Sequence, residues 1–584
     1  MMTEAFPPGL VLLLGAFVLP LVKGRLRDVV ALGLPLIALW LVWQIPDGVA
    51  LSMPFLDYTL EPVKGDSLSR LFATIFAIMA FAGTLFALHQ SRVAELAAAF
   101  AYSGASIGVA FAGDLITVFV FWEIMALGST MVLWASGTES AYRAGFRYII
   151  IHLLGGVLLM AGIVDYAAMT GSIVFEAMEL GGRATWLILA GFLINVAAPP
   201  LSAWLPDAYP EASPGGMVFL SAFTTKTAVY VLLRGFPGTE LLIYLGLYMI
   251  FYGIIYALLE NDMRRILAYS IVNQVGFMVT GIGIGTEMAL NGAAAHAFAH
   301  IIYKALLLMS AGSVLYMTGR RKCSDLGGLF QSMPLTCICG VIGALAISSF
   351  PWTSGFVSKS MINQAAADEH LAALWLLLAA ASAGVFLHAG IKFPWFVFFQ
   401  KDSGLRPPDP PWNMKAAMVL FAFLCIFLGV VPGPLYALLP FPVEYEPYTG
   451  GHVVAMLQLL LFSGLAFFLL LPLMKRTLTI SLDVDWFYRR AGPSLVAALM
   501  ALGRPLDQAL RRLTLRRVDR FLDRLLHYHG PDGRIAGTWQ TGTKLKLPAS
   551  ATVRTNPSLL QPWPKWSRHC TPFPYHRRVH ASAW

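Results

Sequence analysis

Charged residues are scarce in this chain, and their scarcity indicates its class. They make up 12% of 584 residues, about half the share usual in soluble domains. Hydrophobic residues make up 57%, and the mean hydropathy is +0.68. Apolar runs of about 20 residues, long enough to span a bilayer, recur almost throughout. The composition excludes a string of soluble domains and predicts an all-α protein that crosses the membrane many times.

Cysteines and cofactor motifs are also few. The five cysteines are scattered, and the CxC pair of Cys337 and Cys339 has no second pair at a metal-ligand spacing. No nucleotide, flavin, haem or iron–sulfur motif is visible, so we expect neither cofactor nor metal. The first apolar run, residues 6–22, has no basic residue before it and no small-x-small cleavage site after it. We therefore expect a retained span rather than a signal peptide.

The apolar runs predict fourteen to fifteen membrane-spanning helices. The ranges are 6–22, 28–46, 67–88, 93–112, 114–135, 143–170, 184–204, 213–235, 239–259, 263–286, 287–318, 334–361, 370–400, 412–440 and 451–474. After residue 475 the composition changes. Leu and Val faces alternate with Arg clusters up to residue 530, which predicts an amphipathic helical segment on the cytoplasmic leaflet or packed on the protein's own loops. Residues 531–584 are polar and Pro-rich, which predicts a disordered tail.

Basic residues are distributed unevenly among the predicted loops. Loops after odd-numbered spans contain Lys23, Arg25, Arg27, Arg92, Arg143, Arg147, Arg264, Arg265, Arg320, Arg321, Lys322, Lys401 and Arg406. Loops after even-numbered spans contain only Lys64, Arg70, Arg183 and Arg234. Because basic residues favour the cytoplasmic side, we expect the N-terminus outside and the C-terminal tail in the cytoplasm.

Ionisable residues inside the spans are the first candidates for function, because they are costly in a bilayer and mark ion paths or buried pairs. They are Glu123, His152, Lys226, His296, His300, Lys304, Lys359, His388 and Lys392. Glu123 and Lys226 lie mid-span, too deep to reach the surface easily. A buried pair that only fixes helix packing is the alternative for each, but the number of such residues favours an ion path.

Three of these residues form a stripe. His296, His300 and Lys304 recur every fourth position, so they share one helix face at steps of roughly 6 Å. Histidine changes its charge near neutral pH, and such a stripe suits a proton wire. Two histidines at this spacing also occur in zinc-binding helices, but here no carboxylate follows the first histidine and no third ligand is evident.

Two spans contain prolines that predict an interruption. Residues 192–213, "FLINVAAPPLSAWLPDAYPEAS", place Asn195 in apolar surroundings, break at Pro199 and Pro200, and leave through Trp204 and Asp207, which we expect at the cytoplasmic interface. Span twelve repeats this design, with Pro351 ahead of Lys359. Broken helices at corresponding positions of two halves indicate an ion site in an inverted-repeat transporter. We therefore expect two inverted five-helix repeats, spans four to eight and nine to thirteen.

Five segments resemble a known family. They are "GDLITVFVFWEIMAL", "PPLSAWLPDAYPEAS", "FTTKTAVYVLLR", "ENDMRRILAYSIVNQVGFM" and "HAFAHIIYKALLLMSAGSVLY". Over about residues 65 to 400, the chain resembles the NADH:quinone oxidoreductase/Mrp antiporter membrane subunits, and it looks most like the D subunit of Mrp Na⁺/H⁺ antiporters. The resemblance implies a chain of charged residues and water at mid-membrane depth.

The resemblance assigns roles to the candidate residues. It implies that Glu123 is the carboxylate of the fifth helix, that Lys226 is the lysine of the eighth and that Lys359 is the terminal lysine of the twelfth. His296, His300 and Lys304 match the polar stripe of the eleventh helix. At the position of the usual seventh-helix lysine, however, this sequence has Asn195.

An amide cannot carry a proton, so this departure leaves three interpretations open. Lys226 could replace the missing partner of Glu123. Asn195 and Glu123 could instead favour Na⁺ or another cation, since amide and carboxylate oxygens are ligands for hard cations. The subunit could also be structural within a larger assembly. Without a cationic partner, Glu123 is expected to be protonated more readily.

The expected function is that of a membrane subunit of an Mrp-like Na⁺/H⁺ antiporter in the bacterial inner membrane, with other membrane subunits, H⁺, Na⁺ and lipid as partners and no nucleic acid. The alternatives are a proton-pumping subunit of an NADH:quinone oxidoreductase or hydrogenase-type complex, and a scaffold without transport. The expected parts are N-terminal helices 1–92, repeats 93–235 and 239–400, C-terminal helices 412–474, the amphipathic segment 475–530 and the tail 531–584.

Overall fold

The computed structural model describes residues 5–89, 92–472 and 483–529. It divides the chain into two units, Met1–Pro493 and Ser494–Trp584. Among the described residues, eleven helices are long and apolar enough to cross a membrane, and the shorter apolar helices are Pro8–Leu21, Arg183–Asn195 and Pro334–Ile347. Each of the fifteen predicted ranges contains a helix. The prediction of an all-α multi-pass membrane protein is confirmed.

The N-terminal region adds a β-hairpin that the sequence analysis did not predict. Its elements are α1 (Pro8–Val18), η1 (Leu19–Leu21), α2 (Gly24–Val42), β1 (Gly48–Phe55), β2 (Tyr58–Gly65) and α3 (Ser67–Ala87). The strands pair antiparallel across a turn at Leu56, whose φ is 52°. Asp66 then starts α3 with a capping box: its carboxylate accepts from the Ser69 amide at 2.7 Å, and its own amide donates to Ser69 Oγ at 2.8 Å.

The region of the first predicted repeat contains two interrupted spans rather than one. Its elements are α4 (Val93–Phe111), α5 (Leu115–Trp134), α6 (Glu139–Thr170), α7 (Arg183–Asn195), α8 (Trp204–Ala208), η2 (Tyr209–Glu211), α9 (Pro214–Leu220) and α10 (Thr224–Gly235). The expected break follows α7. The expected continuous helix over 213–235 is instead interrupted at residues 221–223. Side chains satisfy the backbone there: Lys226 Nζ donates to the Ser221 carbonyl at 2.7 Å, and the Thr224 amide donates to Tyr102 Oη at 2.8 Å.

In the region of the second predicted repeat, one span is interrupted after α14 (Pro334–Ile347), and another changes to π-helix without a break. Its elements are α11 (Leu241–Leu259), α12 (Met263–Ile284), α13 (Glu287–Thr318), η3 (Cys323–Asp325), η4 (Leu329–Gln331), α14 (Pro334–Ile347), α15 (Ser354–Asp368), α16 (Ala372–Val385), η5 (Phe386–Lys392) and η6 (Trp395–Phe399). The last two are π-helical, a form common at functional sites. Lys392 Nζ donates to the carbonyls of Ala257, Leu258 and Glu260 at 3.0, 2.6 and 2.6 Å. Lys392 therefore fastens η5 to the end of α11.

The two predicted broken helices end in the same way. Two residues past the last helical residue, Ala197 after α7 and Ser349 after α14 adopt left-handed backbone conformations, with φ of 63° and 57°. The amide of the following residue then donates to the carbonyl five positions back, at 3.1 Å and 3.0 Å. This is a left-handed helix termination of the kind that glycine usually provides. Pro199 and Pro351 follow, so neither helix can continue.

The C-terminal part of the first unit contains α17 (Trp412–Val430), α18 (Gly433–Tyr436), α19 (Gly450–Leu470) and η7 (Phe487–Ala491). The carboxylate of Asp483 accepts hydrogen bonds from the hydroxyls of Tyr252 and Tyr269 at 2.6 and 2.8 Å. These bonds attach the segment after α19 to α11 and α12. Within its apolar 18-residue window α19 is only 17% buried, whereas α12 is 100% buried.

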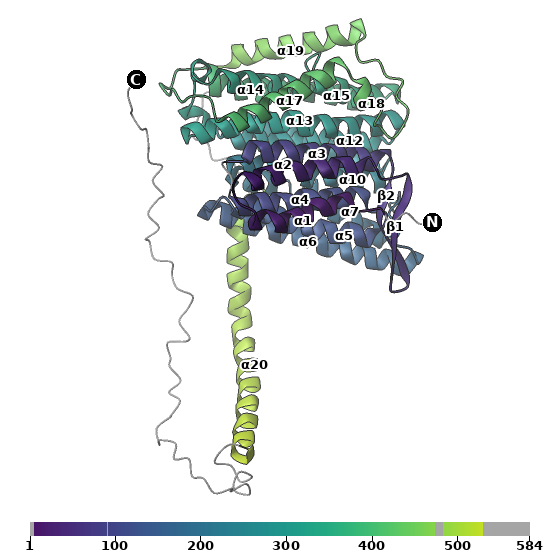
Figure 1. The fold of residues 1–584 in the computed structure, drawn as a ribbon, viewed down its shortest axis with the longest axis vertical. Helices are drawn as coiled ribbons and strands as arrows, with labels where there is room; N and C mark the ends of the chain where they lie inside the picture. The colour runs from purple at the N-terminus through teal and green to yellow at the C-terminus, as the bar shows by residue number, and fades with distance from the viewer. Residues whose placement is uncertain (1–4, 90–91, 473–482, 530–584) are drawn as a thin grey trace. The chain divides into compact units, whose positions relative to one another are not determined.

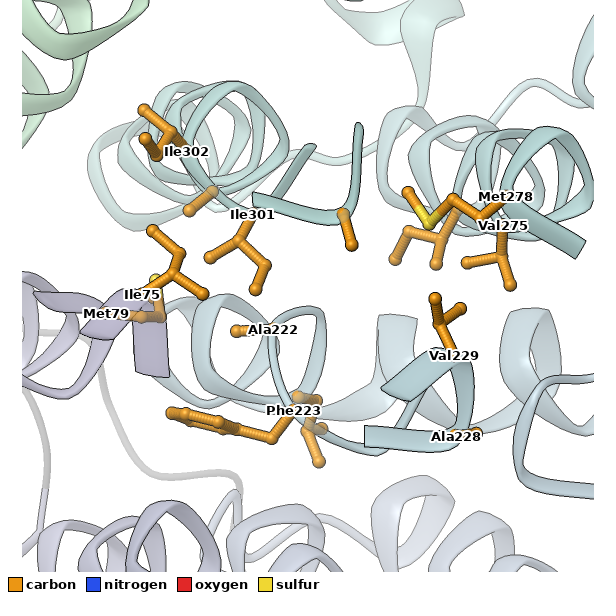
Figure 2. Packing of buried hydrophobic residues seen from close by; sticks show 14 of the residues in the cluster. Ile75, Met79, Ala222, Phe223, Ala228, Val229, Val275, Met278, Ile301 and Ile302 are labelled. Atoms are coloured by element: carbon orange, nitrogen blue, oxygen red, sulfur yellow. The ribbon is translucent and has the colours of Figure 1, made fainter. Parts of the chain in front are cut away.

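The long helices of the first unit lie alongside one another (Figure 1). Next to the α9–α10 break, α10 contacts α3, α12 and α13. Figure 2 shows this junction, where residues at the break and in α10 face α3, α12 and α13; the labelled residues are Ile75, Met79, Ala222, Phe223, Ala228, Val229, Val275, Met278, Ile301 and Ile302. The break therefore lies where the two predicted repeats meet.

The second unit contains most of α20 (Gly492–His529). Its exposed leucines include Leu499, Leu506 and Leu513, and Arg511 pairs with Asp507 at 2.9 Å. A helix is thus present in the segment predicted to be amphipathic, and its role at a membrane surface stays a prediction. Residues 475–482 of that segment and the predicted disordered tail, 531–584, lie outside the described residues.

Candidate functional site

The polar stripe of α13 is fully buried. His296, His300 and Lys304 have 0% of their surface exposed. Because α13 is continuous from Glu287 to Thr318, they lie on one helix face. The rings of His296 and His300 are 6.3 Å apart, centroid to centroid. The predicted spacing of the stripe is therefore present.

A chain of amides fixes which nitrogen of His296 carries a hydrogen. Asn273 Nδ2 donates to the Ile250 carbonyl at 2.9 Å, so Asn273 Oδ1 faces Gln274 and accepts from Gln274 Nε2. Gln274 Oε1 consequently faces His296 Nε2, at 3.1 Å, and also accepts from Tyr303 Oη at 3.1 Å. An amide oxygen only accepts, so His296 Nε2 is the donor. Nδ1 is therefore the nitrogen that can gain or lose a proton.

The second broken span brings Ser358 and Lys359 to this cluster. Ser358 Oγ lies 3.1 Å from His296 Nδ1. The ammonium of Lys359 lies 4.9 Å from the centre of the Phe277 ring on α12, a cation–π contact. It has no hydrogen-bond partner among the described protein atoms, and Lys359 is 1% exposed. A charge-bearing group thus lies within electrostatic range of His296.

Other polar groups of the cluster also lack a protein partner in the described part of the chain. They are both ring nitrogens of His300, Nζ of Lys304 and Nε2 of His388. His388 belongs to η5 and lies within electrostatic range of Lys304 and Lys359. Buried polar groups almost always have a partner, and ordered water provides it where the protein does not. The cluster is therefore suited to hydration.

Lys226 connects this cluster to the first half. Besides the Ser221 carbonyl, its Nζ donates to Thr225 Oγ1 at 3.1 Å. The ammonium lies within electrostatic range of His296, His300 and Lys304. The interruption between α9 and α10 thus holds a buried lysine beside the stripe of α13.

The carboxylate of Glu123 lies against α6, not against either of the partners considered from the sequence. A Cβ atom added to Gly156 would lie 1.9 Å from Glu123 Oε1, so the carboxylate occupies the space that this glycine leaves. Among the ion pairs of the described residues, none joins Glu123 to Lys226, and Oε1 has no hydrogen-bond partner. Among the described residues, no hydrogen bond or ion pair joins Glu123 to Lys226 or Asn195, and the three interpretations stay open.

Asn195 instead contacts His152. Its Oδ1 lies 2.6 Å from Nδ1 of His152 on α6. The His152 ring packs against two aromatic rings, with centroids 4.0 Å from Tyr148 and 4.7 Å from Trp204. The other ring nitrogen, Nε2, has no partner among the described protein atoms. The amide at the end of α7 thus orients a buried imidazole.

Trp204 closes the first break from inside. Its Nε1 donates to the Ile194 carbonyl near the end of α7 at 2.9 Å, and the Ala197 amide donates to the same carbonyl at 3.1 Å. Trp204 is 1% exposed, so its ring is buried in the protein; its position at the cytoplasmic interface stays a prediction. Asp207 forms a two-bond ion pair with Arg147 of α6, at 2.7 and 2.8 Å. Pro199 and Pro200, joined by a cis bond, lie in the chain between Ile194 and Trp204.

A row of hydroxyl groups runs between the two clusters. Tyr148 Oη donates to Ser129 Oγ at 2.9 Å and lies 3.4 Å from Thr224 Oγ1. Thr224 Oγ1 lies 2.5 Å from Tyr102 Oη. Thr224 begins α10, two residues before Lys226.

Comparison with known proteins identifies the region that contains these residues. Residues 112–386 match the family described as NADH:quinone oxidoreductase/Mrp antiporter, transmembrane. They belong to this family. The predicted path from Glu123 to Lys359 lies wholly within the matched antiporter region. The chain is an antiporter-like, multi-pass membrane subunit.

Relatives occur in different complexes. The chain is similar to the D subunit of the Na(+)/H(+) antiporter of Alkalihalophilus pseudofirmus, with 29% identity over 350 residues, covering 56% of this chain and 71% of the relative. It is similar to the N subunit of the NADH-quinone oxidoreductase of Desulforudis audaxviator, with 34% identity over 274 residues, covering 43% of this chain and 54% of the relative. The match with the N subunit thus covers little more than half of the length of that relative.

The fold is also similar to that of a solved membrane complex. A chain in the structure of the membrane-bound sulfane sulfur reductase, an archaeal respiratory membrane complex, superposes with a TM-score of 0.67 and 23% identity. The match covers 91% of this chain and 97% of that chain. At this identity the likeness concerns the fold.

The uncharged members of this antiporter-family site escaped the sequence analysis. Gln274, Ser358 and Tyr148 carry no charge. His152 and His388 were named among the ionisable residues of the spans, but the sequence assigned no role to them. The adjacent amides of "SIVNQVGF" in an otherwise apolar span were the available signal for Gln274. Among the described residues, no group of three or more His, Cys, Asp or Glu side chains lies together as a metal site.

Proposed function

We propose that this chain conducts protons as a membrane subunit of a multi-subunit Mrp-like antiporter that exchanges H⁺ for Na⁺ or a related monovalent cation. The observation that carries this proposal is the buried cluster of His296, His300, Lys304 and Lys359, in which the nitrogens of His300, Lys304 and Lys359 have no hydrogen-bond partner among the described protein atoms. Buried ionisable groups within spans typically form proton relays.

The chemistry of the cluster supports conduction in steps. Glu123, Lys226, the stripe of α13 and Lys359 each bind one exchangeable proton. Protonated lysine and histidine repel one another when they are close in a medium of low dielectric constant. A proton that reaches Lys226 therefore opposes protonation of the stripe and favours release toward Lys359.

We also propose that residues 93–235 and 239–400 are inverted repeats. The matched ends of α7 and α14 support this correspondence, because the same left-handed residue, hydrogen bond and proline recur. The proposed orientation in a bacterial inner membrane, with the N-terminus outside and the tail in the cytoplasm, follows from the basic residues of the loops.

A second candidate is a proton-translocating subunit of a quinone-reducing or hydrogenase-type complex. The 34% identity to the N subunit of an NADH-quinone oxidoreductase favours it. Identifying the chains that copurify with this one distinguishes the candidates: small membrane subunits support the antiporter, whereas iron–sulfur and flavin subunits support the redox complex.

The experiment for conduction uses inside-out membrane vesicles that contain the whole complex. Cation-driven changes of the internal pH are followed with a pH-sensitive dye for Glu123→Gln, Lys226→Ala and the unmodified chain. We expect both variants to lose transport, because each removes an exchangeable proton from the path. Assembly is checked by copurification of the partner chains. Unchanged transport in both variants would overturn conduction and leave the scaffold as the function.

A further inference from the structure

We propose that His152 of α6 is a proton carrier of the first repeat, oriented by Asn195. This inference rests on the proposed function, since it names the group that accepts protons from Glu123. The seventh span ends in a neutral amide, so α7 itself cannot hold a proton at this position. The neighbouring helix provides a titratable ring in direct contact with that amide, at 2.6 Å.

The hydrogen bond to Asn195 determines which nitrogen exchanges the proton. Because Asn195 Oδ1 accepts, Nδ1 of His152 carries the hydrogen. Nε2 is then the basic nitrogen of the neutral ring, and it has no partner among the described protein atoms. A proton that arrives at Nε2 converts the ring to imidazolium. Nδ1 then continues to donate its hydrogen bond to Asn195 Oδ1. Asn195 thus orients the carrier in both protonation states.

The carboxylate of Glu123, a residue of α5, lies against α6 one helical turn beyond His152. Its Oε1 fills the space at Gly156, four residues after His152, and residues four apart on a helix are roughly 6 Å apart. This spacing separates the two positions on α6, and we infer that water bridges the carboxylate and the imidazole. The carboxylate on α5 and the imidazole on α6 are therefore neighbours.

On its other side, His152 faces the row of hydroxyl groups. Its ring packs against Tyr148, with 4.0 Å between centroids, and Tyr148 Oη lies near Thr224 Oγ1 at the start of α10. Lys226 is two residues further along the same helix. We infer the order Glu123, His152, hydroxyl row, Lys226, with water completing the steps between groups that do not touch.

Few charged groups surround His152 on the elements that pack against α6. They are Glu123 on α5, Arg183 of α7 paired with Asp165, Asp207 of α8 paired with Arg147, and Glu211 of η2 paired with Arg321. Each of the last three is engaged in an ion pair. Among the described residues around His152, Glu123 is thus the carboxylate without an ion-pair partner.

The transport test compares His152→Gln, the double variant His152→Gln/Asn195→Lys and a matched control, His452→Gln. His452 bonds to the Pro447 carbonyl at 2.8 Å and stacks on Phe356 of α15. In vesicles with the whole complex, we expect His152→Gln to reduce transport by at least about tenfold. The double variant should recover a large part, because its ammonium lies where the imidazole was. The control should retain transport.

These outcomes separate the inference from the proposed function. If Glu123→Gln abolishes transport but His152→Gln does not change it, the inference is overturned and conduction stands. If His152→Gln reduces transport and the lysine restores nothing, His152 only packs the helices, and the inference is overturned as well. Absence of transport by the unmodified complex counts against the proposed function itself.

A spectroscopic measurement tests the carrier independently of transport. In the whole complex with ¹⁵N-labelled histidine, the signals missing from His152→Gln identify His152. We expect the neutral ring with hydrogen on Nδ1 and reversible protonation at Nε2 as the pH is lowered from about 8 to about 4. A ring that remains neutral over this range, or that carries its hydrogen on Nε2, would overturn the inference.

Discussion

The two broken spans use the same backbone for different chemistry. α7 and α14 both end at a left-handed residue followed by proline, but the groups beyond differ. The first break has the amide of Asn195 at its edge and is closed by Trp204, whereas the second is followed by Lys359, a buried ammonium without a hydrogen-bond partner among the described protein atoms.

The comparison separates the shape of a site from its charge. A broken helix provides space and free backbone groups, but it does not determine which residue binds the proton. In the second half the ammonium stands on the broken span itself. In the first half the ionisable groups, Glu123 and His152, stand on α5 and α6, beside the break.

Replacing Lys359 gives the largest expected difference between the halves. We expect Lys359→Met to reduce cation-driven proton transport by at least about a hundredfold, because methionine cannot bind a proton. The complex should still assemble, since the substitution removes a buried charge and keeps the volume. Transport in vesicles and copurification of partners measure the two effects.

Lys415→Met, a half-buried lysine at the start of α17, is the control for Lys359→Met. It changes the same side chain away from the cluster and should retain transport. Normal transport by Lys359→Met would mean that protons leave the protein elsewhere. The second broken span, like the first, would then provide no ionisable residue to the path.

A pair of adjacent glycines tests the first half. In Gly156→Ala the new Cβ would lie 1.9 Å from Glu123 Oε1, so the flexible carboxylate must move away. We expect transport to fall by roughly tenfold, since small misplacements of reacting groups are costly, with little loss of thermal stability. Transport rate and melting temperature are measured on the same preparation.

Gly155→Ala is the matched control. Its Cβ would have its nearest contact at 3.4 Å, with the Ile194 side chain. It should therefore retain both transport and stability. Equal transport by the two variants would show that the position of the Glu123 carboxylate against α6 does not matter.

The smallest expected effect concerns the shared backbone. A left-handed conformation costs an ordinary residue roughly 1–2 kcal/mol relative to glycine. Glycine relieves this strain, but it also gains more entropy on unfolding, which offsets part of the gain. We therefore expect Ala197→Gly and Ser349→Gly each to raise the free energy of unfolding by at most about 1 kcal/mol. Thermal unfolding in detergent measures this. A decrease in both would contradict the common helix ending, and a decrease in one would show that the two breaks differ.

The interrupted helices could be predicted only where proline marks them. Pro199 and Pro351 indicate the breaks after α7 and α14. The break between α9 and α10 contains Ser221, Ala222 and Phe223, with neither proline nor glycine, and it depends on a side chain that bonds to the freed Ser221 carbonyl. The β-hairpin was not predicted, although its strands alternate apolar and polar residues. The elements of the chain were predicted from long apolar runs, and the hairpin contains none.

The site shows a similar limit. Glu123, Lys226, His296 and Lys359 could be found from sequence because charge within a span is rare. Amides and hydroxyls are common within spans and often only pack, so Gln274 and Ser358 gave no comparable signal. The contact of Asn195 with His152 joins two helices, and no pattern along one sequence encodes it.

One hydroxyl group makes the second break responsive to its neighbour. Ser358 has a single hydroxyl proton and two possible acceptors, the Ser354 carbonyl at 3.0 Å and His296 Nδ1 at 3.1 Å. While Nδ1 is protonated, it donates to Ser358 Oγ, and the hydroxyl keeps its bond to Ser354. Once Nδ1 loses its proton, the hydroxyl can serve only one of the two. A change of charge on α13 thereby loosens or tightens the first turn of α15, the helix that carries Lys359.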